Sequence, residues 1–459
     1  MNKKLSRRDF LKLAGITSAG LALSACGVKA TELPTATLIP PTNTPLPTET
    51  LIPTPTLTST PTLPLEQLPQ TKQALIEFAQ AFKAVGMDIS TDQLIQKGLE
   101  TRTITGKDKK QNEIAFVRVE NLNGFEGDYP LIIKVEDGEW NSRPIVAELF
   151  SSNGILFGFT YADLDGNQYR KIVRAPDALI AESSKIVTPE DAFYQGFTFD
   201  KNNKIINWRH VDEYLTFIDN FDLISGAPHL YWAGNEHTAQ NQEDLVNRTT
   251  QLVKHCKGLI HTWDINELFK DNGTPKDANT LSNARAVIEV ARKADPTAKI
   301  IINDYGMDIN PIKDNSNFEF ISQLMEEGVL KEGDIVGYQG HSGIEYKKSP
   351  EEFADWFDKY ANLGLNLRIT EADFFDVKSI SAANEIKKAN ILLMYYHAGK
   401  ILDNNNGRKV LDSIVVWGST NNSSWLNDIG RTGEFPLLLD DNGNPYLSWY
   451  LIGKALFVE

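Results

Sequence analysis

The sequence is poor in cysteine and in basic residues. Cys26 and Cys256 are its two cysteines, too few for a disulfide framework or a thiolate metal cage. Lys and Arg number 46 against 61 for Asp and Glu, and the resulting net charge of −15 would repel nucleic acid. The hydrophobic share of 41% and charged share of 23% exclude wholesale disorder and a multi-span membrane protein. At roughly 100 to 200 residues per domain, 459 residues allow two to four domains.

Residues 1–26 have the pattern of an export signal, with a basic start before a modest apolar run. Ser6-Arg7-Arg8-Asp9-Phe10-Leu11-Lys12 resembles the twin-arginine motif, and Leu23-Ser24-Ala25-Cys26 resembles a bacterial lipobox. The resemblance implies lipidation of Cys26, cleavage ahead of it, and an extracytoplasmic protein anchored to the outer face of the bacterial membrane or cell surface. An uncleaved anchor and a plain cleaved signal are the alternatives.

Residues 27–70 are predicted to be a disordered linker. Residues 31–70 contain ten Pro and twelve Thr, and they contain no Gly, aromatic or basic residue. Proline at this density favours extended polyproline II geometry, so forty residues could hold a domain roughly 100 Å from the lipid. Pro/Thr tracts can also carry O-glycans.

Residues 71–150 are predicted to be a small α+β unit. Apolar residues from Leu75 to Val85 recur at helical spacing, and Ser90 with Gln93 resembles the capping box of a second short helix. Strand-like pieces such as 114–119 and 131–135 follow, separated by glycine turns. A spacer or barrel lid is the simpler role for this unit, and sugar binding is the alternative.

Residues 151–459 alternate short apolar runs with longer amphipathic stretches, which predicts parallel strands connected by helices. Eight such units in about 300 residues indicate a (β/α)8 TIM barrel in the α/β class. A doubly wound sheet is the alternative, but no Gly-rich phosphate turn follows any run. The expected strands are 155–160, 185–188, 222–231, 259–264, 298–303, 334–339, 366–370 and 413–417, and three of the expected helices are 282–293, 317–327 and 350–363.

Two glutamates follow strands of this barrel. Glu267 ends the fourth and Glu371 ends the seventh, 104 residues later. Because the C-terminal ends of barrel strands share one rim, the two carboxyls should face each other across the mouth. Such pairs hydrolyse glycosidic bonds, one carboxyl protonating the departing oxygen and the other attacking the anomeric carbon. A lone strand-end glutamate is more often a surface or salt-bridged residue.

Five motifs and one further segment make a family resemblance specific. Trp263-Asp264-Ile265-Asn266-Glu267 resembles the Trp-Asp-Val-Val-Asn-Glu motif of glycoside hydrolase family 10, the retaining endo-β-1,4-xylanases, with one residue fewer. The family's later motifs are matched in order by Ile302-Asn303-Asp304-Tyr305, Gly337-Tyr338-Gln339-Gly340-His341, Ile369-Thr370-Glu371-Ala372-Asp373 and Trp417-Gly418 to Ser424-Trp425, and Pro436-Leu437-Leu438 precedes the closing helix.

The resemblance implies a role for each matched residue. Glu267 would be the general acid/base and Glu371 the nucleophile. Asn266 would bind the 2-hydroxyl of the sugar being cleaved, while His341 orients Glu371 and Gln339 supports the same region. Trp417 and Trp425 would stack on sugar rings with their indole N–H groups free for hydroxyls. Core packing of the tryptophans and a structural role for His341 are the simpler alternatives.

The sequence departs from the family at strands 2 and 3. The strand-2 segment Thr-Pro-Glu-Asn-x-Met-Lys-Trp is matched by 188–195, which keeps Glu190 but has Tyr194 in place of the sugar-binding lysine. After strand 3, Trp232 persists, a histidine is displaced to His229, and the final histidine is Ala233. Glu190, Tyr194, His229 and Trp232 are therefore predicted to bind substrate at an altered subsite.

The sequence thus predicts a monomeric endo-β-1,4-xylanase that needs no cofactor or metal, acts on xylan or a related β-1,4-linked polysaccharide, and touches the membrane only through its lipid anchor. Two alternatives stay open: a barrel glycosidase for another β-glycan, and a surface glycan-binding lipoprotein with weakened turnover. Cys256 is expected to be a small buried residue of the helix before strand 4.

Overall fold

The computed structural model divides the chain into two compact units, Met1–Thr62 and Leu63–Glu459, and every described residue belongs to the second. The expected signal peptide, Cys26, the linker up to residue 67 and Tyr194 lie outside the described residues. Within the described part of the chain, no helix combines the length and apolar character needed to cross a bilayer. The described residues are 68–90, 94, 98–107, 109–135, 138–162, 177–190, 192–193, 198–200, 204–205, 207–233 and 241–458.

Parallel strands form the barrel that the alternating pattern predicted. Every neighbouring pair of strands in this sheet is parallel, and β14 pairs with β5, so the last strand returns to the first. In chain order the strands are β5 (Leu156–Tyr161), β6 (Ile186–Pro189), β7 (Ile224–Ser225), β8 (His229–Trp232), β9 (Thr262–Asn266), β10 (Lys299–Asp304), β11 (Ile335–Tyr338), β13 (Asn366–Phe375) and β14 (Leu411–Val416).

The third strand position is interrupted, although the sequence predicts one strand over 222–231. β7 pairs with β6, and β8 pairs with β9. Pro228, between the two pieces, has no N–H for a ladder, but its carbonyl accepts a 3.1 Å hydrogen bond from the backbone N–H of Asp264. At Gly226 a Cβ atom would lie 1.9 Å from Oγ1 of Thr188, so only glycine fits. Backbone hydrogen bonds on both sides of the interruption therefore close the barrel.

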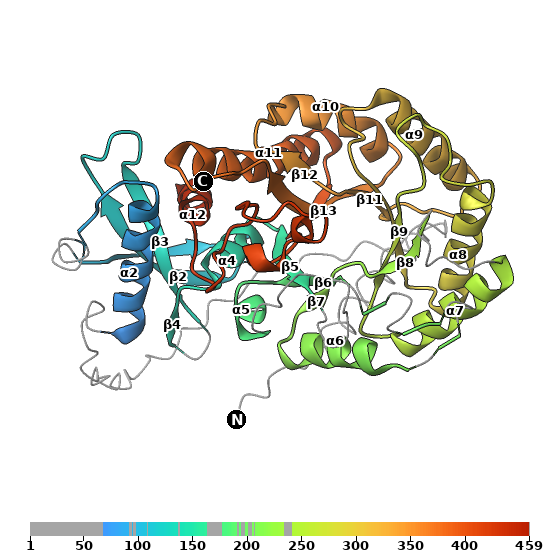
Figure 1. Cartoon of the computed structure of the whole chain (residues 1–459), viewed down its shortest axis with the longest axis horizontal. Helices are drawn as coiled ribbons and strands as arrows, with labels where there is room; N and C mark the ends of the chain where they lie inside the picture. The colour runs from blue at the N-terminus through green and yellow to red at the C-terminus, as the bar shows by residue number, and fades with distance from the viewer. Residues whose placement is uncertain are drawn as a thin grey trace, which may run out of the picture. The chain divides into compact units, whose positions relative to one another are not determined.

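Helices separate the strands and pack around them (Figure 1). Cap residues explain several boundaries: α9 starts at Pro311, earlier than expected, because Asn310 accepts a hydrogen bond from the backbone of Lys313. Ser349 and Glu352 form the capping box of α10. Cys256, at the end of α7, is fully buried as expected. The helices are α5 (Asp177–Glu182), α6 (Arg209–Asn220), α7 (Gln242–His255), α8 (Thr280–Ala294), α9 (Pro311–Glu326), α10 (Pro350–Ala361), α11 (Ala382–Asn406) and α12 (Leu447–Val458), with 3-10 turns η3 (Asn421–Ser423) and η4 (Trp425–Asn427).

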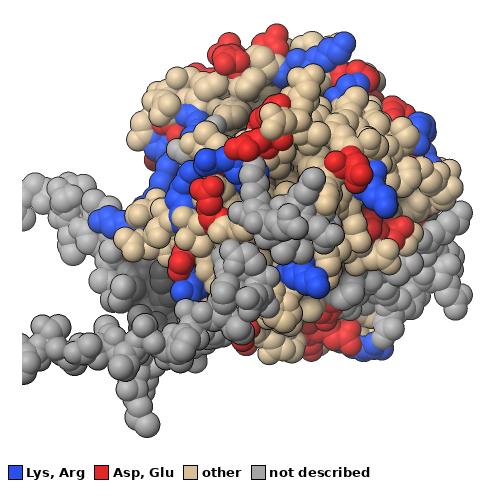
Figure 2. All heavy atoms as spheres, turned by 90° about the vertical axis from the view of Figure 1, so that its left-hand side faces the viewer, with Lys and Arg blue, Asp and Glu red and all other residues tan. Residues whose placement is uncertain are grey.

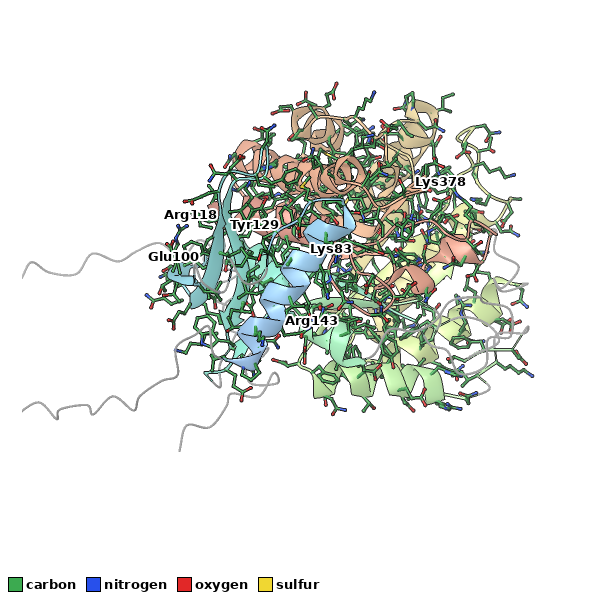
Figure 3. All side chains as sticks on the ribbon, turned by 60° about the vertical axis from the view of Figure 1, so that its left-hand side comes forward. Lys83, Glu100, Arg118, Tyr129, Arg143 and Lys378 are labelled. Carbon is green, nitrogen blue, oxygen red and sulfur yellow. The ribbon has the colours of Figure 1, made fainter. Side chains whose placement is uncertain are left out.

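An antiparallel sheet precedes the barrel, in the order β1-β2-β3-β4. The elements are α2 (Pro69–Ala84), β1 (Glu100–Thr105), β2 (Gln111–Val119), β3 (Gly127–Lys134), β4 (Trp140–Asn141) and α4 (Ile145–Ser152). In Figure 3, Tyr129 lies on this sheet beside α2, and Glu100 and Arg118 project from its outer side. Figure 2 shows Lys and Arg interspersed with Asp and Glu over the described part of this face.

The C-terminal helix α12 joins this sheet to the barrel (Figure 1). On the side of the sheet, the Phe116 ring packs against Phe457 with centroids 5.3 Å apart, and Phe78 contacts Tyr450 at 5.1 Å. On the side of the barrel, Trp449 stacks on Phe159. One continuous hydrophobic core therefore runs from α2 through α12 into the barrel.

Candidate active site

The C-terminal ends of β9, β10, β11 and β13 meet at one rim of the barrel. The register pairs Asn303 with Asn266 across β10 and β9, and β11 leads directly to Gln339. A further strand, β12 (His341–Gly343), pairs with the end of β13 and aligns His341 with Asp373. This pairing extends β13 to Phe375, beyond the expected end at residue 370. Side chains that are far apart in sequence therefore converge on this rim.

Glu371 is buried and held from two sides. Its Oε1 accepts a 3.0 Å hydrogen bond from Nδ2 of Asn303, and its Oε2 lies 3.3 Å from Nε2 of His341. The backbone N–H of Glu371 donates to the carbonyl of Gln339 at 2.7 Å. A carboxylate fixed at both oxygens and through its backbone is oriented for attack on a bound atom.

His341 bridges two carboxylates. Its Nδ1 lies 2.9 Å from Oδ1 of Asp373, on the side opposite Glu371. Burial alone would lower the pKa of this histidine, but the negative charges of Asp373 and Glu371 outweigh it and raise the pKa to about 10. At neutral pH the ring is therefore an imidazolium that donates one hydrogen bond to each carboxylate.

Trp425 differs from expectation. Its indole Nε1 donates a 2.6 Å hydrogen bond to Oδ2 of Asp373, so this N–H is not free for sugar hydroxyls. The tilted rings of Trp425 and His341 lie 5.1 Å apart. A buried carboxylate such as Asp373 needs every available donor, which explains why the protein itself uses the indole N–H.

Glu267 occupies a strained position at the end of β9. Its φ of 52° lies in the left-handed region, which is uncommon for a residue with a side chain. Its backbone N–H donates to the carbonyl of Asn303 at 2.9 Å, which holds this conformation in place. The side chain is less buried than that of Glu371, and its Oε2 lies 3.4 Å from Nζ of Lys276.

Gln339 links the two glutamates. Its Nε2 donates 3.1 Å hydrogen bonds both to Oε1 of Glu267 and to Oδ1 of Asn266, while its backbone carbonyl accepts from Glu371. Asn303 forms a second link, through its carbonyl to Glu267 and its amide to Glu371. The structure thus brings together five predicted residues: Glu267, Glu371, Asn266, Gln339 and His341.

His229 lies beside this network. Its Nδ1 is 3.4 Å from Nδ2 of Asn266, and its Nε2 is 3.4 Å from Oδ2 of Asp264. Burial lowers the pKa of His229, although the charges of Glu371 and Glu267 oppose this shift. The rings of Trp232 and Trp417 lie 5.6 Å and 6.2 Å from the His229 ring, so these three predicted residues share one side of the site.

No role was predicted from the sequence for three residues of the network: Asp264, Asn303 and Asp373. Asn303 Nδ2 donates to Oδ2 of Asp264 at 3.1 Å, and burial followed by the charge of Glu371 raises the pKa of Asp264 well above its ordinary value. Asp264 lies between Trp263 and Ile265, and Asn303 directly follows three isoleucines, so a polar residue beside apolar neighbours could have revealed each of these two.

His229, Asp264 and Glu371 are close enough for metal coordination, since one donor atom from each lies within 4.8 Å of the others. The amide of Asn303 donates hydrogen bonds to both carboxylates, however, and an N–H group directed at these oxygens opposes a cation. The donor set therefore fits a hydrogen-bond network better than a metal site.

Glu190 is buried at the end of β6, where it accepts a hydrogen bond from Thr160 Oγ1. Thr160 Oγ1 in turn accepts a 2.8 Å hydrogen bond from the backbone of Gly418, next to Trp417. Glu190 is thereby tied to the loop of one predicted stacking residue. Ala233 is also buried, with its N–H donating to the carbonyl of Asn266.

Comparison with known proteins identifies relatives of the barrel. The chain is 28% identical over 294 residues to endo-1,4-beta-xylanase B of Thermotoga neapolitana, covering 59% of this chain and 80% of that protein. It is 28% identical over 229 residues to endo-1,4-beta-xylanase C of Paenibacillus barcinonensis, covering 44% of this chain but only 20% of that longer protein. A crystal structure of xylanase 10B from Thermotoga petrophila, in complex with xylobiose, matches 68% of this chain and 97% of its own, with a TM-score of 0.58 at 25% identity.

The family profile agrees with these relatives. The profile described as glycosyl hydrolase family 10 matches residues 146–455, which include every barrel strand and the network around Glu267 and Glu371. The chain belongs to glycosyl hydrolase family 10.

Proposed function

We propose that the protein is a retaining endo-β-1,4-xylanase that cleaves internal bonds of xylan by double displacement. One observation carries the proposal: two glutamates from different strands are held on one rim by the same two residues, Gln339 and Asn303. Retaining hydrolysis needs such a pair at fixed separation. The relatives named above as endo-1,4-beta-xylanases support xylan as the substrate.

In the first step, Glu371 attacks the anomeric carbon while Glu267 donates a proton to the departing glycosidic oxygen. The bond to the leaving sugar breaks as the glycosyl–enzyme ester forms. In the second step, Glu267 removes a proton from water, and the resulting attack releases the sugar and frees Glu371. Both carboxyls return to their starting state, so no external acid or base is consumed.

The surrounding residues position these reactants. Gln339 fixes Oε1 of Glu267, and the imidazolium of His341 fixes Oε2 of Glu371. Asn266, held by Gln339, would hydrogen-bond the 2-hydroxyl of the sugar under attack. Trp417 and Trp425 would offer flat apolar faces to neighbouring sugars.

The stereochemistry of the products tests the mechanism. In proton NMR of a xylohexaose digest, a retaining enzyme releases β-anomers first, and the α-anomers appear later by mutarotation. Initial formation of α-anomers would exclude the double displacement. Product sizes in the same digest distinguish endo from exo cleavage.

A second candidate is hydrolysis of a different β-glycan. Ala233 is a buried methyl group where the family resemblance implies a histidine, so this subsite has lost a donor. Parallel digestions of xylan, mixed-linkage glucan and mannan, scored by new reducing ends, separate this candidate from the first. A glycan-binding protein without turnover would bind one of these polymers and release no reducing ends from any.

We also propose that the chain is exported as a twin-arginine lipoprotein and displayed on the outer face of the cell membrane. The proposal rests on the twin-arginine motif at residues 6–12 and on the lipobox that ends at Cys26. Metabolic labelling with a radioactive fatty acid should mark the wild type and not Cys26→Ala. Equal labelling of both would contradict lipidation at this residue.

A further inference from the structure

Lys276 returns to the active site at the end of a short hairpin. The chain leaves β9 at Glu267, and an antiparallel bridge between Phe269 and Pro275 reverses its direction. The backbone N–H of Lys276 then donates to the carbonyl of Leu268 at 3.0 Å. Nine residues after the acid/base, the lysine therefore lies beside it again.

The hairpin is braced by α9. Its turn residue Gly273 has a φ of 77°, and a Cβ atom there would lie 2.7 Å from Oγ of Ser316 and 2.9 Å from Cγ2 of Ile312. Nδ2 of Asn310 donates a 2.8 Å hydrogen bond to the carbonyl of Asp271. Close packing and this hydrogen bond fix the position from which Lys276 projects.

Two ammonium groups flank the ring of Tyr305, but only one of them is accessible. Nζ of Lys313 lies 3.1 Å from the ring centroid, is almost fully buried and pairs with Oδ1 of Asp304 at 2.6 Å. Nζ of Lys276 lies 6.0 Å from the centroid, and its side chain is 22% exposed. Among the described residues the one ion-pair partner of Lys276 is Glu267, at 3.4 Å. An ammonium has three donors, so Lys276 can hold another acceptor.

The oxygens of Glu267 point to different surroundings. Oε1 accepts from Gln339, which also binds Asn266 on the side of the sugar under attack. Oε2 faces Lys276, so the lysine contacts the carboxyl oxygen of Glu267 that Gln339 does not hold. If Asn266 binds the sugar under attack, Lys276 is placed for the departing group. When Glu267 carries the proton that it donates, the ammonium loses its counter-charge while the leaving part of the substrate is bound.

We infer that Lys276 binds the carboxylate of a uronosyl side group on the leaving part of the substrate, so that the preferred polymer is an acidic xylan. This inference rests on the proposed function. The chain has a net charge of −15, so a local cation is needed to offset repulsion of an anionic polymer. Salt screens that repulsion beyond about 8 to 10 Å, whereas a direct ammonium–carboxylate contact acts at shorter range.

Glucuronoxylan and the same polymer with its carboxyls chemically reduced to alcohols are the matched substrates, because they share chain length and branching. The quantity measured is the ratio of kcat/KM on the acidic polymer to kcat/KM on the reduced polymer. Because both values come from one preparation, the ratio is independent of the fraction of folded enzyme. Lys276→Met should lower it about fivefold, and Lys276→Arg should keep it within about twofold.

Lys270→Met is the control, because Lys270 is an exposed cation in the same hairpin. The ratio of the two kcat/KM values in this variant should equal that of the wild type. About 0.5 M NaCl should reduce the difference between wild type and Lys276→Met. The inference is overturned if Lys276→Met lowers kcat/KM equally on both polymers, since the lysine would then act on Glu267 alone. If the wild type releases no reducing ends from either polymer, the proposed function fails instead.

Discussion

The indole N–H of Trp425 donates a 2.6 Å hydrogen bond to Asp373, the carboxylate that holds His341. Because His341 contacts Glu371, a predicted sugar-stacking residue is connected to the predicted nucleophile through Asp373 and His341. If a sugar stacks on Trp425, its contact with the ring should therefore be coupled to the orientation of Glu371.

Replacing Trp425 separates its two roles. Trp425→Phe keeps an apolar face but removes the donor to Asp373, so kcat should fall about tenfold with little change in KM. Trp425→Ala also removes the face and should raise KM. Steady-state kinetics on xylohexaose measure both constants. An unchanged kcat in Trp425→Phe would show that the indole hydrogen bond does not support catalysis.

The two glutamates should respond differently to leaving-group ability. Glu371→Gln should lower kcat about 10³-fold or more on every substrate, because the amide that replaces the carboxylate cannot attack the anomeric carbon. Glu267→Ala should lower kcat about 10²- to 10⁴-fold on xylan. The decrease should be much smaller on an aryl xylobioside, because its phenol departs without protonation. Azide should restore turnover in Glu267→Ala and yield a β-glycosyl azide. Equal losses on xylan and the aryl xylobioside would contradict the general-acid role of Glu267.

His341 should make the free energy of unfolding decrease as the pH rises into the alkaline range. Its folded-state pKa of about 10 lies above its ordinary value of about 6.5, so the stabilising charge is fully present below pH 6.5 and is lost as pH rises through 10. The free energy of unfolding should therefore decline more steeply between pH 7 and pH 10 in the wild type than in His341→Asn. Urea titrations across this range measure the difference. Parallel curves would contradict an imidazolium between Asp373 and Glu371.

Asn303 serves two neighbouring carboxyls as a donor. Asn303→Asp places a third acidic group between Asp264 and Glu371, whereas Asn303→Ala only removes the amide. Asn303→Asp should lower the free energy of unfolding by about 3 kcal/mol or more, because a buried carboxylate would face the acceptor oxygens of Asp264 and Glu371. Asn303→Ala should lower it less. Thermal unfolding of both variants at pH 7 and at pH 5 compares them, and the aspartate should recover stability at pH 5, where protonation restores a donor. Greater stability for Asn303→Asp at pH 7 would contradict this account.

A fully buried ion pair in α11 is hydrogen-bonded to the segment that leads into α12. Nζ of Lys388 lies 2.7 Å from Glu385 and donates to the carbonyl of Leu437, and Glu385 accepts from the backbone of Ser448. Lys388→Met leaves a buried carboxylate without its partner and should cost about 3 to 5 kcal/mol. The double variant Lys388→Met/Glu385→Leu should recover part of this loss. Additive losses in chemical denaturation would show that the two residues are not coupled.

Much of the barrel was predictable, because each strand is a short apolar run followed by polar residues. The interruption at Pro228 was not predicted, although proline inside an expected strand was the available signal. Parallel strands alone implied that Glu267 and Glu371 share a rim.

The contacts within the site depend on spacing that the sequence does not display. Trp425 and Asp373 are 52 positions apart, and no periodicity relates an indole nitrogen to a carboxylate at that separation. Lys276 is near Glu267 only because a hairpin reverses the chain between them. The positions of Tyr194 and Cys26 lie outside the described residues, so their roles stay predictions.

The packing of α12 between the antiparallel sheet and the barrel has a consequence for biosynthesis. The unit of α2 and β1 to β4 emerges from the ribosome before the barrel, but Tyr450 and Phe457, which contact Phe78 and Phe116, are in the final 12-residue helix. The surface of this unit that packs on α12 must therefore stay uncovered until translation has ended. A gene fragment that begins at the first barrel strand would leave the opposite surface of α12 without its cover, and the truncated product should aggregate when expressed.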